Sequence, residues 1–151
     1  MLSIEDRVAI NELLARYYLA NDNKDVNAAL ACCTPDATID GDFTMSSDQQ
    51  EEDLERIYQG EPGLKRHLML NPIVLEVSEE QVSMQHMMLV VEASVFPKVI
   101  ATSKVHDIFK KVESEWKIHV HTIEIDPSGK WIVKIGKGVQ SMIESLKQKF
   151  S

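Results

Sequence analysis

The chain opens with a strong helical pattern. Its apolar positions recur three and four residues apart, at Ile10, Leu13, Leu14 and Tyr17. This spacing puts one apolar stripe on a helix, which we predict over Ile4–Asn21. Ser3 can cap that helix, with Asp6 in the capping-box position. A polar run at residues 21–25 ends the helix and holds the carboxylate of Asp22 at a rigid corner.

A second, shorter helix is predicted after that corner. Asp25 can cap it and Val26 begins it. It stops before Pro35, because the residue that precedes a proline disfavours the helical region. The segment Asp36–Gly41 then predicts a short strand that closes on a glycine turn.

Two further segments have helical or strand-like patterns outside these regions. Ser47 and Gln50 form a second capping-box signature, which predicts a helix that runs to about Gln59. Near the end of the chain, residues Trp131–Ile135 predict a short strand and Val139–Phe150 an amphipathic helix.

From Lys65 onward the period of the apolar positions changes to two. Four long strand-like runs follow, at Lys65–Val77, Gln81–Phe96, Lys98–Val112 and Glu115–Asp126. The breaks between them are short, as in antiparallel hairpins. Pro72 interrupts the first run and predicts an edge strand or a bulge.

Helices first, then a long meander, then a helix indicate an α+β fold in which a curved sheet wraps its early helices. The 151 residues suit a single domain over 1–151 with a core or a core and a pocket. A bent sheet closed on one side by helices leaves a concave mouth, where a small ligand can bind.

The composition of the chain limits the kinds of molecule that we expect it to bind. The formal charge of -8 argues against nucleic acid, which needs a clustered basic face. We see no long uncharged apolar run and no basic leader, so we expect no membrane span and a cytoplasmic protein. Cys32 and Cys33 are adjacent, which is poor geometry for a disulfide between them, so we interpret both as reduced. The seven methionines indicate a pliable pocket or a soft core.

Histidines supply the candidate chemistry. A carboxylate such as Asp22 can orient one imidazole tautomer and leave the other nitrogen of His67 to take or give a proton. In the alternative, Asp22 only ends a helix and His67 is a satisfied strand residue. His119 and His121 lie two apart on a strand, as metal ligands can, but the spacing to Glu124 fits poorly. We expect no metal there, and a role for these histidines in a sheet face or a subunit contact.

Other candidates for the pocket come from the strands and the first helix. His86 and Met88 share a strand face and fit either an apolar ligand cavity or a packed core. His106 and Asp107 are strand neighbours and point to opposite faces. Tyr17 and Tyr18 lie on adjacent helix faces, so we expect at most one hydroxyl in the pocket. The pocket residues that we expect are Tyr17, Tyr18, Met69, His86, Met88 and His106.

Several of these segments together resemble a known family. They are Ile10–Tyr17, Asp22, Asp25, Leu30, Thr34–Ala37, Arg66–His67, Phe109–Lys111 and Trp116–Ile118. They are similar to SnoaL-like proteins of the NTF2-like superfamily, over roughly residues 4–126. The resemblance implies a cone-shaped α+β barrel with a mixed or antiparallel sheet, an apolar pocket and a homodimer formed through the sheet. Relatives include polyketide cyclases, a scytalone dehydratase and steroid isomerases.

The resemblance also suggests roles for two residues. Asp22 and His67 are similar in position to the catalytic pair of the dehydratase, whereas Asn21 and Gly41 stand where it has tyrosines, and Thr102 or Ile100 stands where it has a second histidine. We therefore expect a cofactor-independent lyase, isomerase or cyclase that acts on a small hydrophobic, cyclic or polyketide-like molecule. The alternative is a non-catalytic ligand-binding or dimerisation module on the same fold.

Overall fold

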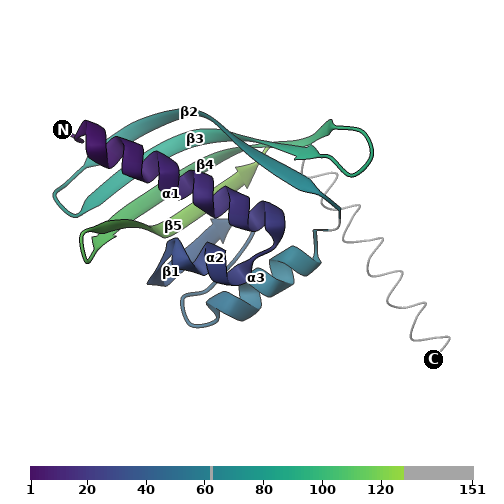
Figure 1. Cartoon of the computed structure of the whole chain (residues 1–151), viewed down its shortest axis with the longest axis horizontal. Helices are drawn as coiled ribbons and strands as arrows, with labels where there is room; N and C mark the ends of the chain where they lie inside the picture. Colours follow the sequence, from purple (N-terminus) through teal and green to yellow (C-terminus); the bar gives the residue numbers. More distant parts are fainter. Residues whose placement is uncertain (62, 128–151) are drawn as a thin grey trace.

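The computed structural model describes residues 1–61 and 63–127 (Figure 1). The predicted strand Trp131–Ile135 and the predicted helix Val139–Phe150 lie outside the described residues. The described elements are α1 (Ile4–Asn23), α2 (Val26–Ala31), β1 (Cys33–Gly41), α3 (Gln50–Gln59), β2 (Lys65–Val77), β3 (Gln81–Glu92), β4 (Lys98–Val112) and β5 (Glu115–Ile125). None of the described helices is long and apolar enough to cross a membrane.

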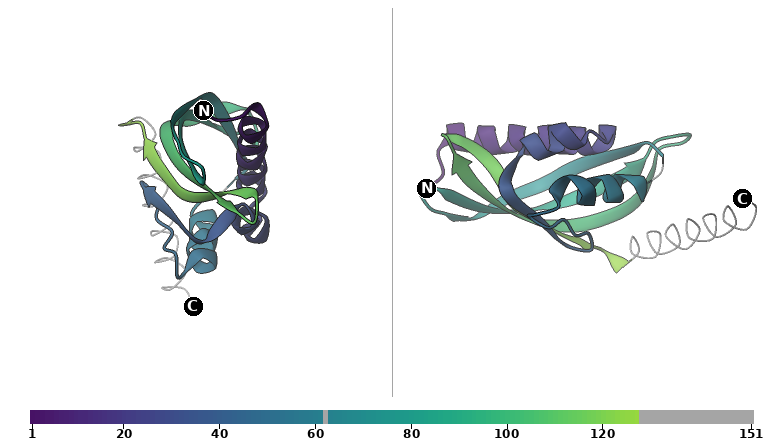
Figure 2. Two further views of the ribbon diagram at one scale, coloured as in Figure 1. Left: turned by 90° about the vertical axis from the view of Figure 1, so that its left-hand side faces the viewer. Right: turned by 90° about the horizontal axis from the view of Figure 1, so that it is seen from below.

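The five strands form one curved, mixed sheet. Their order is β1-β5-β4-β3-β2, in which β1 is parallel to β5 and the other pairs are antiparallel. Figure 2 shows the sheet curving round until α1 closes its open side, while α2 and α3 lie beside β1. This α+β architecture, a bent sheet around N-terminal helices, agrees with the sequence prediction.

The first two helices begin as the sequence predicts. The Ser3 hydroxyl accepts from the backbone N–H of Asp6, and the Asp25 carboxylate accepts from the backbone N–H of Ala28. α1 extends two residues beyond its predicted end, to Asn23, and Lys24 caps it in the left-handed conformation. Asp22 therefore lies in the last turn of α1.

Other boundaries differ from the prediction. α2 ends at Ala31, and β1 already begins at Cys33. Pro35 lies where the register between β1 and β5 is irregular, between Cys33 and Thr38. No side chain caps α3. Asp53 instead accepts hydrogen bonds from the backbone N–H and hydroxyl of Ser46. β3 ends at Glu92, four residues before the predicted end.

Pro72 produces both features that its position predicts. β2 is an edge strand, and its register with β3 shifts between Leu70 and Ile73. The extra residue on β2 keeps the exposed Leu68 and Leu70 before Pro72 and the exposed Ile73 after it on one face of the strand.

The core lies between α1 and the concave face of the sheet. α1 contributes Ile10 and Leu14, and the strands contribute Val82, Phe109 and Ile118, all fully or almost fully buried. This packing fills the end of the barrel near the start of α1. Toward the end of α1, aromatic and polar side chains replace the aliphatic ones.

Candidate active site

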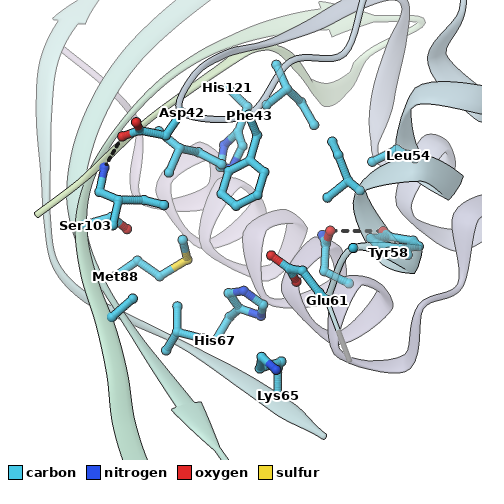
Figure 3. A pocket seen from close by; sticks show the side chains of 18 of the residues that line it. Asp42, Phe43, Leu54, Tyr58, Glu61, Lys65, His67, Met88, Ser103 and His121 are labelled. Carbon is cyan, nitrogen blue, oxygen red and sulfur yellow. Dashed lines mark hydrogen bonds between the residues drawn. The ribbon is translucent and has the colours of Figure 1, made fainter. Parts of the chain in front are cut away.

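A cavity of about 720 Å³ lies inside the curved sheet, between α1, α3 and the segment after β1. Much of its lining is apolar, from Ile39, Phe43, Leu54, Ile57, Met88, Val90, Ile100, Ala101, Ile123 and Ile125. Tyrosines, histidines, an asparagine and a serine add polar groups, and the charged residues Asp42, Glu61 and Lys65 (Figure 3) and Arg56 also line the cavity. Its size and lining are those of a site for a small organic ligand.

Asp22 and His67 form a hydrogen-bonded pair at this cavity. The imidazole Nδ1 of His67 lies 2.7 Å from Oδ1 of Asp22, and the same oxygen accepts from the backbone N–H of His67 at 3.1 Å. Both side chains are largely buried, at 13% and 8% exposure. His67 lines the cavity (Figure 3). Because Nδ1 is held by the carboxylate, Nε2 is the ring atom left for a ligand.

Tyr18 packs its ring against that histidine. The two rings are nearly parallel, with an interplanar angle of 13° and centroids 5.9 Å apart. The hydroxyl of Tyr18 lies 2.6 Å from Nε2 of His86 in the interior. α1 thus supplies both the carboxylate that orients His67 and the ring that supports its face.

A second cluster of histidines surrounds a fully buried carboxylate. Asp107 faces His121 across the β4–β5 pair, and Nδ1 of His121 lies 2.5 Å from its Oδ1. Nδ1 of His86, from β3, lies 3.3 Å from Oδ2 of the same carboxylate. Asp107 has no exposed surface, His86 is 1% exposed and His121 is 2% exposed. Of these three residues, His121 reaches the cavity lining.

Burial and charge act in opposite directions on Asp107. Burial raises the pKa of its carboxyl, but the charge and hydrogen bond of His121, together with those of His86, outweigh burial and lower it. The carboxyl is therefore ionised at neutral pH. Burial and the charge of Asp107 raise the pKa of Tyr18 well above its ordinary value, so this hydroxyl keeps its proton.

The predicted pocket residues divide into two groups. Tyr17, Tyr18 and Met88 line the cavity together with His67. Three others are placed elsewhere and correct the prediction. Met69 packs against the core, His86 lies behind the lining against Tyr18, and His106 bonds Ser83 on the opposite face of the sheet.

The sequence interpretation missed the pairing of Asp107 with His121. A bulge in the β4–β5 pair separates His119 from His121, so the two histidines do not act together. His119 instead contacts Thr34 and Lys110. Across the described ranges, no three His, Cys, Asp or Glu side chains are grouped to hold a metal ion.

Ser103 is a further polar residue of the lining that the sequence interpretation missed. It lies opposite Met88 in the β3–β4 pair and is 1% exposed. Its hydroxyl has no hydrogen-bond partner within the described part of the chain. The alternation of β4 places it on the same face as Asp107, which is the signal that could have identified it. A buried hydroxyl without a partner can donate to an oxygen of a ligand.

Together these groups form an apolar cavity with an oriented imidazole, a second imidazole and a hydroxyl donor. Such a site can take a proton from a carbon acid and stabilise the charge that develops on a neighbouring oxygen.

Comparison with known proteins adds a family and a set of fold relatives. The model of the SnoaL-like domain family matches residues 2–122. No curated protein matches the chain. A Nostoc punctiforme protein of unknown function with a cystatin-like fold superposes with a TM-score of 0.74 at 23% identity, over 84% of this chain and 96% of that one.

Two further solved structures have the same fold. A candidate scytalone dehydratase from Novosphingobium aromaticivorans superposes with a TM-score of 0.69 at 16% identity, over 82% of this chain and 85% of that one. ActVI-ORFA from Streptomyces coelicolor superposes with a TM-score of 0.69 at 16% identity, over 80% and 97%. At these identities the likeness extends to the fold alone.

Proposed function

The chain belongs to the SnoaL-like family, and from that premise we propose that it is an enzyme that moves protons on a small hydrophobic, cyclic ketone. The reaction class is that of a lyase, isomerase or cyclase that needs no cofactor. His67 is the general base and Asp22 its orienting partner. The observation that carries the proposal is their 2.7 Å contact beside the apolar cavity.

The chemistry follows from the tautomer of His67. Asp22 accepts the Nδ1–H, so the lone pair of Nε2 takes a proton from the carbon beside the carbonyl group. The electron pair of that C–H bond moves onto the carbonyl oxygen, which becomes an enolate. Ser103, whose hydroxyl has no partner among the described residues, is the donor that we assign to this oxygen. Returning the proton to another carbon, or expelling a leaving group, completes the reaction.

The lining of the cavity supports a ring-shaped, mostly apolar substrate. Aromatic and aliphatic side chains dominate it, and about 720 Å³ is space for a molecule of two or three fused rings. This class includes polyketide-derived ketones. One fold relative is a candidate scytalone dehydratase, which supports a small organic substrate.

Hydrogen–deuterium exchange tests the proposal without knowledge of the natural substrate. The probe is 1-tetralone, a bicyclic ketone, incubated with the protein in D₂O, and mass spectrometry follows deuterium at the carbon beside the carbonyl. We expect the wild-type protein to accelerate exchange and His67→Asn to lose about 10²–10⁴-fold of that acceleration. Asparagine is chosen because its amide nitrogen can still donate to Asp22.

A matched control comes from the other face of the sheet. His106→Asn removes a histidine that bonds Ser83 outside the cavity, so it should exchange 1-tetralone at the wild-type rate. Equal exchange by wild type and His67→Asn would refute the assignment. Thermal stabilisation by 1-tetralone without any exchange would favour the alternative, a ligand-binding module.

We also propose that the chain forms a homodimer through the sheet. β2 exposes a row of large apolar side chains along the strand: Leu68, Leu70, Ile73 and Leu75, which are 45–56% exposed. Contiguous exposed apolar side chains of this kind mark interaction surfaces. A second copy of the chain, which presents the same row, would cover them.

A further inference from the structure

The cavity has charged side chains that the proposed function does not use. Asp42, Arg56, Glu61 and Lys65 all contribute to its lining. Arg56 forms an ion pair with Asp53 at 2.5 Å. Asp42 and Lys65 have partners as well. The carboxylate of Glu61, in contrast, has no hydrogen-bond or ion-pair partner among residues 1–61 and 63–127.

The backbone of Glu61 is held by both of the helices that reach the cavity. Its N–H donates to the carbonyl oxygen of Tyr58 in α3, at 3.3 Å, and its carbonyl oxygen accepts from Nζ of Lys24, the residue that caps α1, at 2.6 Å. The side chain is partly buried, and its carboxylate points into the cavity (Figure 3). Because neither backbone contact uses the carboxylate, this group is left for a ligand.

The C-terminal ends of the same two helices meet at this side of the cavity. Asn21 in the last turn of α1 lines the cavity, and so do Tyr58 and Gly60 at the end of α3. The hydroxyl of Tyr58 donates to Oδ1 of Asn21 at 2.9 Å, which joins the two ends. The C-terminal end of a helix carries a partial negative charge. The charge of Glu61 therefore adds to that of two helix ends, and the sum favours a cation.

The charge of Glu61 also acts inside the cavity, beside aromatic rings. Burial first, and then the charges of Cys33 and Glu61, raise the pKa of the Tyr58 hydroxyl above its ordinary value. The ring of Tyr58 lines the cavity together with those of Tyr17 and Phe43. The faces of aromatic rings attract ammonium groups. A ligand with a positive charge would thus meet both a carboxylate and aromatic faces.

On the basis of the proposed function, in which the ketone group of the substrate reacts at His67, we propose that the substrate also carries a protonated amine and that Glu61 binds it. The substrate class then narrows to small cyclic amino ketones. The ammonium group donates to the carboxylate of Glu61, while the apolar lining covers the rings. A ligand with a carboxylate in the same place is rejected, because like charges repel each other.

Matched derivatives of 1-tetralone test this selectivity by isothermal titration calorimetry. Each aromatic ring position in turn carries an aminomethyl group as the cation, a methyl group as the neutral match, or a carboxyl group as the anion. We expect the wild-type protein to bind at least one aminomethyl derivative about tenfold more tightly than its methyl match. The carboxylate at the same ring position should bind more weakly than the methyl derivative.

Three variants assign the selectivity to Glu61. Glu61→Gln keeps the size of the side chain and removes its charge, so the amine and methyl derivatives should then bind within about twofold of each other. Glu61→Lys should reverse the preference and favour the carboxylate. Glu55→Gln is the matched control, because Glu55 is an exposed residue of α3 outside the cavity lining, and it should keep the wild-type preference. Near-ultraviolet circular dichroism checks that the variants are folded.

The affinities decide the inference. A preference for the amine that Glu61→Gln removes and Glu55→Gln keeps supports it. Equal binding of the amine and methyl derivatives to the wild-type protein at every ring position would overturn it. An equal preference for the amine in the wild-type protein and in Glu61→Gln would overturn it as well.

Deuterium exchange into unsubstituted 1-tetralone, measured on the same wild-type preparation, tests the proposed function separately. Exchange without a preference for the amine leaves the proposed function standing and overturns the inference. Amine binding that depends on Glu61, without any exchange, supports the amine site and overturns the proposed function. Absence of both overturns the two proposals together.

Discussion

One carboxylate oxygen of Asp22 accepts both the ring Nδ1–H and the backbone N–H of His67, at 2.7 and 3.1 Å. The ring contact sets the tautomer, and the backbone contact ties the end of α1 to the start of β2. Asp22 thus holds the end of α1 and the start of β2, which are far apart in sequence, together beside the cavity. The proposed proton transfer depends on this corner.

The hydroxyl of Tyr18 offers a first test of the buried network. Tyr18→Phe leaves Nε2 of His86 buried without the hydroxyl that lies 2.6 Å from it, which should lower the free energy of unfolding by about 1–3 kcal/mol. Urea denaturation measures this change. Tyr58→Phe is the control, because its hydroxyl bonds the part-buried Asn21. Equal losses of unfolding free energy in the two variants would argue against a special contribution of the contact between Tyr18 and His86.

The low pKa of Asp107 makes its contribution to stability depend on pH. Its folded pKa lies below the ordinary 3.8, because His121 and His86 outweigh burial. A lowered folded pKa gives stability that is present above the unfolded value and is lost as the pH falls through the folded value. Asp107→Asn should therefore cost about 3–5 kcal/mol at pH 5 and less at pH 3, measured by urea denaturation. A cost that is constant or larger at pH 3 would contradict this.

Burial should make the two cysteines slow to react. Burial first, and then the charges of Cys32 and Asp107, raise the pKa of Cys33 to about 12, and burial raises the pKa of Cys32 as well. Raised pKa values leave little thiolate at pH 8. Iodoacetamide should then modify neither cysteine quickly in the native protein but both in urea, as intact-mass spectrometry reports. Rapid native alkylation of both would disprove the burial of this helix end.

The dimer can be tested on the exposed row of β2. A lysine at the centre of the row, Leu70→Lys, should convert a dimer into a monomer, because a buried ammonium group is costly. Light scattering after size-exclusion chromatography measures the mass. Leu19→Lys, on the exposed side of α1, is the control and should remain dimeric. A monomeric wild-type protein would refute the dimer.

Local patterns predicted much of the fold. The starts of β2, β3, β4 and β5 match the predicted starts, because the change to a period of two and the short breaks are local features of the sequence. The end of α1 was two residues off, because Lys24 adopts a left-handed cap that no short pattern signals. The boundaries of α2, β1 and α3 depend on contacts between segments distant in sequence.

The candidate site was predictable only in part. The resemblance to a family pointed to Asp22 and His67, and strand alternation placed His106 and Asp107 on opposite faces. Alternation alone does not say which face is inside, so it does not distinguish the inward Asp107 from the outward His106. The partnership of Asp107 with His121 depends on strand register and on a bulge beside His119, which arise from pairing across the sheet.

The most direct test of the central claim is the rate of deuterium entry into 1-tetralone with the wild-type protein, Asp22→Asn and His67→Asn under one set of conditions. The account predicts acceleration by the wild-type protein, a loss of about 10²-fold or more in His67→Asn, and a smaller but clear loss in Asp22→Asn, where the ring is no longer oriented by a charge. Wild-type rates in both variants would contradict it.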